Sequence, residues 1–138
     1  MFKYAVRVDA SQGKVKVALV DWPEVSVAAR RDPLIELKGA LLAEIARCVR
    51  SKLPIRVPKA RPSPSFFVRL SPGEALKVMV INEMFASGRD FRAAAASLDL
   101  SERVIKQALD LGQPTDVELL NRILAVVGKR LLAYTVAC

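Results

Sequence analysis

The fold of the second half is decided by residues 90–111, which read DFRAAAASLDLSERVIKQALDL. Asp90 and Ser101 are residue types that cap helix N-termini, so this stretch predicts two short helices. The predicted helices are Phe91–Leu98 and Glu102 to about Leu111. About three residues join them, and the run of four alanines in the first helix lets the second approach closely. These features predict a helix-turn-helix, although an ordinary helical bundle would share the pattern.

The outward-facing residues of the second helix are of types that read DNA bases. In a helix-turn-helix this helix lies in the major groove, with its N-terminal residues nearest the base edges. Arginine pairs with guanine, glutamine pairs with adenine, and glutamate accepts from cytosine. Arg89 and Arg92, at the start of the preceding helix, are predicted to contact phosphates together with that helix's N-terminus. The predicted base-reading residues are Ser101, Glu102, Arg103, Lys106 and Gln107.

Two further helices are expected around this pair. Ser71 and Glu74 have the spacing of a capping box, and the helix that follows is apolar nearly all round, which indicates burial on several sides. A second capping box at Thr115–Glu118 begins a helix that Gly128 ends. The closing segment 131–136 is β-prone, so we expect it to pair with the first-half sheet or with a second copy of the chain. The second arrangement predicts a homodimer or a higher even oligomer.

The first half predicts three strands followed by a helix. Alternation of polar and apolar residues indicates a β-hairpin and then a shorter third strand. The expected strands are 2–8, 14–19 and 25–29. A helix is expected from Pro33, with Asp32 as its N-cap. Its apolar stripe consists of Leu34, Leu37, Leu41, Ile45 and Cys48.

A proline-rich, basic segment follows this helix. We expect it to be an extended linker whose Arg56, Lys59 and Arg61 contact phosphates, or else a solvated tether. Residues 66–70 are the candidate for a fourth strand, because so small a unit buries little surface alone. The expected fold class is α+β: a small β-β-β-α domain and an all-α helix-turn-helix domain with a terminal β-strand. The expected division is 1–56 for the first domain, 57–65 for the linker and 66–138 for the second domain.

The charge is distributed unevenly. The net charge of +8 indicates a polyanionic partner. Residues 1–70 hold 14 Lys or Arg against 6 Asp or Glu, giving +8, whereas residues 71–138 hold 8 of each, giving zero.

Several function classes lack their residues. Histidine is absent, which removes the commonest general base at neutral pH, and we expect no enzymatic activity, cofactor or metal site. Cys48 is predicted to be a small buried residue and Cys138 is the last residue, so no disulfide framework is expected. No apolar run has the length of a membrane span, and the N-terminal residues lack the apolar block of a signal peptide. A cytoplasmic protein without a membrane partner is therefore expected.

Five segments in order resemble one known family. They are VALVDWPE at 17–24 with its aspartate–x–proline turn, the helix after Asp32-Pro33, residues 71–85, the helix pair at 91–111, and VVGKRL at 126–131. Their order and spacing, over nearly the whole chain, are similar to HicB-family antitoxins with a C-terminal helix-turn-helix. The resemblance implies a partly RNase H-like N-terminal fold that is not a nuclease. It also implies a HicA-type toxin partner, which cleaves RNA, and autorepression of the operon by the DNA-binding domain.

The leading hypothesis is therefore an antitoxin that binds double-stranded DNA and represses its own transcription. One alternative is a solitary DNA-binding regulator, of phage or mobile-element origin, without a toxin partner. Another is a protein-inhibitor module in which the helix pair is only structural, and a small hydrolase is the most distant alternative.

Overall fold

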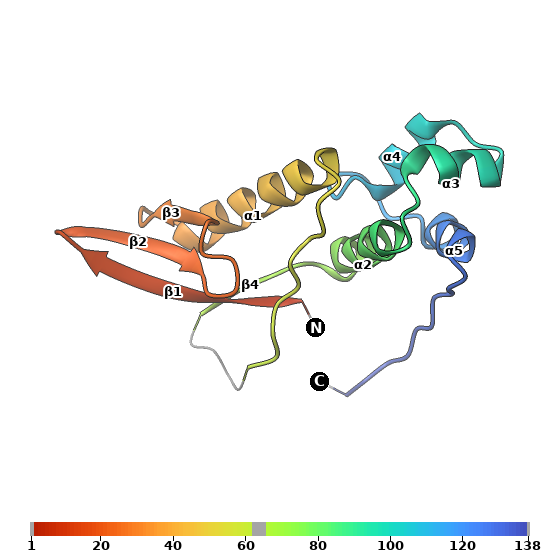
Figure 1. Ribbon diagram of the computed structural model, residues 1–138. Coiled ribbons are helices and arrows are strands. Elements are labelled where there is room, and N and C mark those ends of the chain that lie inside the picture. Colours follow the sequence, from red (N-terminus) through yellow and green to blue (C-terminus); the bar gives the residue numbers. More distant parts are fainter. Residues whose placement is uncertain (1, 62–65, 138) are drawn as a thin grey trace. The chain divides into compact units, whose positions relative to one another are not determined.

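The chain folds as two compact units, each described by itself below. The structure is a computed structural model that describes residues 2–61 and 66–137. Unit 1 is Met1–Ala75 and unit 2 is Leu76–Cys138, so the division falls within the first turns of a helix. In the described residues the architecture is mixed α+β, with a four-stranded antiparallel sheet and five helices (Figure 1).

Unit 1 is built on the antiparallel sheet, whose strand order is β3-β2-β1-β4. The strands are β1 (Lys3–Ser11), β2 (Lys14–Leu19), β3 (Ser26–Ala28) and β4 (Phe67–Arg69). The predicted hairpin is confirmed: β1 and β2 pair from Val6↔Leu19 to Ser11↔Lys14. The turn between them places Gln12 at φ 54° and Gly13 at φ 73°. Two consecutive positive φ values suit a tight hairpin, because such turns match the twist of the strands.

One face of the sheet is covered by α1 (Pro33–Arg50), which follows β3 (Figure 1). Burial of its stripe is confirmed for Leu37, Leu41, Ile45 and Cys48. The prediction was wrong for Leu34, which is 38% exposed because it lies in the first turn of the helix, beside an open groove. Asp32 occupies the N-cap position, but its side chain forms no capping hydrogen bond. Its backbone (φ −128°, ψ 70°) departs from the extended geometry that normally aims an N-cap side chain at the helix N–H groups.

The segment after α1 is held to unit 1 by polar contacts, without forming helix or strand over residues 53–61. The Tyr4 hydroxyl donates a 2.8 Å hydrogen bond to the carbonyl oxygen of Arg56, and burial raises the pKa of this tyrosine. Asp21 accepts from the Lys59 backbone N–H at 3.0 Å and from the Arg61 guanidinium at 2.7 Å. These contacts fix an extended segment along the unit.

The fourth strand completes the sheet of unit 1. β4 pairs antiparallel with β1 through Lys3↔Arg69, Tyr4↔Val68 and Ala5↔Phe67. Whereas the sequence-based ranges place residues 66–75 in the second domain, the structure includes them in unit 1. The reason is backbone pairing: β1 is an inner strand only because β4 satisfies its second edge.

Unit 2 consists of short helices around an apolar core. They are α2 (Pro72–Ala86, whose first residues lie in unit 1), α3 (Phe91–Leu98), α4 (Glu102–Leu109) and α5 (Val117–Val126). The capping box of α2 is confirmed: the Ser71 N–H donates to Glu74 Oε1 at 2.8 Å, and the Glu74 N–H donates to Ser71 Oγ at 3.2 Å. Burial on several sides of α2 is also confirmed, because Val78, Val80, Ile81 and Met84 are each 0% exposed.

Three expectations for the end of the chain are corrected. The N-cap of α5 is Asp116, whose side chain accepts from the Leu119 N–H at 3.0 Å, and not Thr115. α4 ends at Leu109, two residues early, because Asp110 leaves helical geometry (φ −72°, ψ 119°). The predicted terminal strand is absent from the described residues, since 129–137 pair with no strand of this chain. Its backbone has no partner edge, and Leu132, Tyr134 and Val136 are 74%, 86% and 72% exposed.

Within residues 2–61 and 66–137, no helix has both the length and the apolar character that crossing a bilayer requires.

Candidate nucleic-acid interface

α3 and α4 are two short helices whose ends are fixed by capping hydrogen bonds. Asp90 Oδ1 accepts from the Ala93 N–H at 2.9 Å, and Ser101 Oγ accepts from the Val104 N–H at 3.3 Å, which confirms both predicted caps. Between the helices, Asp99 adopts the left-handed conformation at φ 54°, and the Leu100 N–H donates to the Ala95 carbonyl at 2.9 Å. This αL residue ends α3 sharply and redirects the chain into α4 after three residues.

The inner sides of the two helices pack together. Ala94 and Ala95 of α3 are buried, as are Ile105, Ala108 and Leu109 of α4. The small alanine side chains allow close approach, and the two helices are in contact with each other. α5 contacts both of them and contributes the buried residues Leu120, Ile123 and Leu124. The orientation of α4 is therefore set by a continuous apolar core.

The outer side of the helix pair carries every residue of unit 2 that the sequence predicted to contact DNA. These exposed residues are Arg89, Arg92, Ser101, Glu102, Arg103, Lys106 and Gln107. Lys106 Nζ forms an ion pair with Glu102 Oε1 at 3.1 Å, and the Ser101 hydroxyl is occupied as a cap. Within the described part of the chain, the side chains of Arg103 and Gln107 form no hydrogen bond or ion pair. These two side chains have all their donors available to a ligand.

Lys77 of α2 is a contributor that the sequence predictions missed. Its side chain is 0% exposed, and Nζ donates to the carbonyl oxygens of Asp110 at 2.7 Å, Gln113 at 2.6 Å and Pro114 at 3.4 Å. A buried ammonium requires such partners, because desolvating an unpaired charge is costly. Lys77 thereby anchors the loop that follows α4. The signal available in the sequence was a lone lysine within an otherwise apolar stretch of helix.

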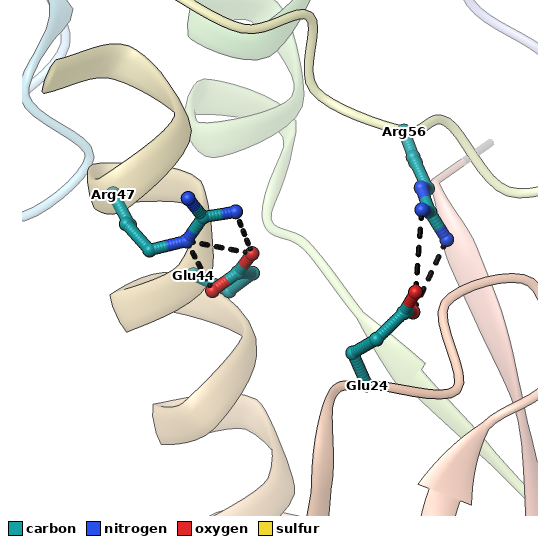
Figure 2. A network of polar contacts seen from close by, with 4 residues as sticks. All are labelled: Glu24, Glu44, Arg47 and Arg56. Carbon is teal, nitrogen blue, oxygen red and sulfur yellow. Dashed lines mark hydrogen bonds and ion pairs between the residues drawn. The ribbon is translucent and has the colours of Figure 1, made fainter. Parts of the chain in front are cut away.

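The three predicted phosphate contacts of the linker belong to unit 1, so they form a separate group from the residues on α3 and α4. Arg56 pairs with Glu24 at 3.2 Å and lies over the Trp22 ring at 5.7 Å, near a second ion pair on α1 between Glu44 and Arg47 (Figure 2). The Arg61 guanidinium, followed by the Lys59 N–H, lowers the pKa of Asp21 by hydrogen bonding.

Other features of unit 1 bear on chemistry. Cys48 is buried, and that burial raises the pKa of its thiol, while Cys138 lies outside the described residues. A shallow groove of about 430 Å³ runs between α1 and β4, with apolar walls formed by Ile35, Leu42 and Phe67 among others. In the described ranges no three His, Cys, Asp or Glu side chains are grouped so that they could hold a metal ion.

Comparison of the sequence with models of known protein families and with curated proteins gives no match to either.

Proposed function

We propose that this protein is a regulator that binds double-stranded DNA sequence-specifically, with α3 and α4 acting as a helix-turn-helix. The observation that carries the proposal is the outer side of α4. There Arg103 and Gln107 are exposed and have no polar partner within the described chain. Exposed long side chains without internal partners lose little on binding, because no existing hydrogen bond has to be broken.

The proposed contacts fall into two kinds. Arg103, in the first turn of α4, donates two hydrogen bonds to a guanine, and Gln107 pairs with an adenine one helical turn later. Arg89 and Arg92 lie at the start of α3, where the helix N-terminus adds its own positive potential, so they bind phosphates. Phosphate contacts set the register and base contacts set the sequence preference. The Glu102–Lys106 pair must open if either residue is to reach a base.

The test compares Arg103→Ala with two other arginine variants in mobility shifts on the chain's own promoter and on random duplex DNA. We expect Arg103→Ala to lose about 1–3 kcal/mol of specific affinity, with little change on random DNA. Arg92→Ala should weaken both alike, because a phosphate contact carries no sequence information. Arg122→Ala, an exposed arginine on α5, is the charge-matched control and should change neither. Equal losses on both DNAs for Arg103→Ala would remove it from base reading.

Binding as a homodimer is part of the proposal, and the C-terminal segment supports it. Leu132, Tyr134 and Val136 alternate along the chain, and all three are more than 70% exposed. Alternating apolar residues form one face of a strand, and a symmetric partner supplies the missing edge. Sedimentation should show a dimer that a variant ending at residue 130 loses. A monomeric full-length chain at micromolar concentration would contradict this arrangement.

Neutralisation of a HicA-type toxin rests on the resemblance to HicB antitoxins alone. A catalytically inactive HicA-type toxin, encoded beside this gene, should co-purify with the full chain in low salt. Absence of such a complex would leave the DNA-binding proposal intact and would favour a solitary regulator.

A further inference from the structure

The sheet of unit 1 has a second face, opposite α1, whose composition differs from that of the covered face. Side chains alternate between the faces of a strand, so burial of Tyr4, Leu19 and Val68 marks the face under α1. The strand register then assigns the other face. Lys3 pairs with Arg69 and Ala5 pairs with Phe67 across β1 and β4. The outer sheet face is defined by Lys3, Arg7, Lys14, Lys16, Phe67 and Arg69, all of which are exposed.

This outer sheet face is strongly cationic. It has five basic side chains and one carboxylate, that of Asp9 opposite Lys16. The small residues Ala5 and Ala18 on the same face are buried, so the long cationic side chains form its accessible surface. Like charges directly opposite each other, as at Lys3↔Arg69, destabilise a sheet. An anionic ligand would remove that cost.

An aromatic ring lies among these charges. Phe67 is 37% exposed, with Lys3 Nζ 5.0 Å and the Arg69 guanidinium carbon 5.3 Å from its ring centroid. Proteins that bind single-stranded nucleic acids combine basic side chains along the phosphates with aromatic rings on which bases stack. An acidic peptide would account for the charge but would make no use of the ring. Duplex DNA hides its base faces within the stack, so a ring on a sheet cannot reach them.

We propose that the outer sheet face binds single-stranded nucleic acid, with one base stacked on Phe67 and the flanking phosphates on Lys3, Arg7, Lys16 and Arg69. This goes beyond duplex recognition by α4, since it uses other residues, another unit and another form of nucleic acid. RNA and single-stranded DNA share the required phosphates and bases, so the experiment includes both.

The test measures fluorescence anisotropy of the full chain with labelled oligouridylate and oligodeoxythymidylate of about 12 nucleotides, a length within the range of single-strand sites. We expect salt-dependent binding to at least one of them, and the RNA-to-DNA affinity ratio identifies the source. Phe67→Leu keeps apolar bulk but removes the flat ring, and should weaken binding about fivefold or more. Phe67→Trp should bind at least as tightly as the wild type. Loss with both variants to the same extent would exclude stacking.

A charge-matched pair of triple variants tests the phosphate contacts. Lys3→Gln, Arg7→Gln and Lys16→Gln together should weaken binding and make the salt dependence shallower by roughly 2, because each phosphate that a single strand no longer has neutralised changes the slope by about 0.7. Arg30→Gln, Arg31→Gln and Arg50→Gln remove the same charge from exposed positions outside this face and should stay close to wild type. Circular dichroism confirms that each variant is folded.

Three results would overturn the proposal: affinity weaker than about 100 µM for both oligonucleotides in low salt, equal losses in the two triple variants, or tight binding of polyglutamate without binding of either oligonucleotide. Failure here is separable from failure of duplex recognition. Arg103→Ala should leave single-strand binding unchanged, and Phe67→Leu should leave duplex binding unchanged.

Discussion

The two units use positive charge in opposite ways. Unit 1 has the surplus of basic residues, yet several of them are paired internally: Arg56 with Glu24, Arg61 with Asp21 and Arg47 with Glu44. Residues 71–138 have no net charge, yet α4 displays Arg103 without an internal partner among the described residues. Net charge therefore indicates the class of partner, but the local pairing of each side chain indicates where that partner can bind.

A second contrast separates the two lysines that anchor α2. Lys38 of unit 1 pairs with Glu74 at 3.0 Å and its side chain is 37% exposed, whereas Lys77 of unit 2 is fully buried among carbonyl oxygens. Surface ion pairs contribute little because water screens them. Hydrogen bonds from a buried charged group contribute more, and their loss leaves the acceptors unsatisfied.

The largest effect is expected from Lys77→Met, which retains the length of the side chain but not its donors. We expect a loss of about 3 kcal/mol in the free energy of unfolding, measured by urea denaturation. Lys38→Met is the matched control and should cost less than about 1 kcal/mol. Similar losses for the two variants would remove the proposed difference between the units.

The next effect concerns Asp21, which holds the extended segment of unit 1. Asp21→Ala removes the acceptor for the Lys59 N–H and the Arg61 guanidinium, and should cost about 1–2 kcal/mol at pH 7. The pKa of Asp21 is lowered in the folded chain, chiefly by Arg61. Its stabilisation is therefore complete above the ordinary value of 3.8 and is lost as the pH falls through the lowered pKa.

The pH dependence of that difference is the measurement. The gap in unfolding free energy between wild type and Asp21→Ala should be constant from pH 7 to about 5 and should close under more acidic conditions. A gap that widens in acid would contradict the assigned direction. Asp9→Ala, which changes an exposed carboxylate of the same unit, serves as the control and should show no comparable gap.

The contrast between the units also shows which features could be predicted from the sequence. The caps at Asp90 and Ser101, the hairpin and the buried stripe of α1 depend on neighbours in the sequence, and these predictions are confirmed. Lys77 and Asp21 act on residues more than 30 positions away, and no periodicity reports such a contact. The terminal strand was predicted from residue preference, but a strand requires a partner edge, which this chain does not supply to residues 129–137.

The smallest effect compares two aspartates at helix N-termini, one in each unit. Asp90 accepts a 2.9 Å hydrogen bond from the Ala93 N–H, whereas Asp32 forms no capping bond although it occupies the same position. Both carry a negative charge near a helix N-terminus, which is worth a few tenths of a kcal/mol in either case. Asp90→Ala should therefore cost about 1 kcal/mol in unfolding free energy and Asp32→Ala less than about 0.5 kcal/mol. Because charge and helix position are matched, the difference isolates the cap bond itself. If Asp32→Ala proves as costly as Asp90→Ala, then residue type alone determines the effect and the observed backbone geometry at Asp32 does not.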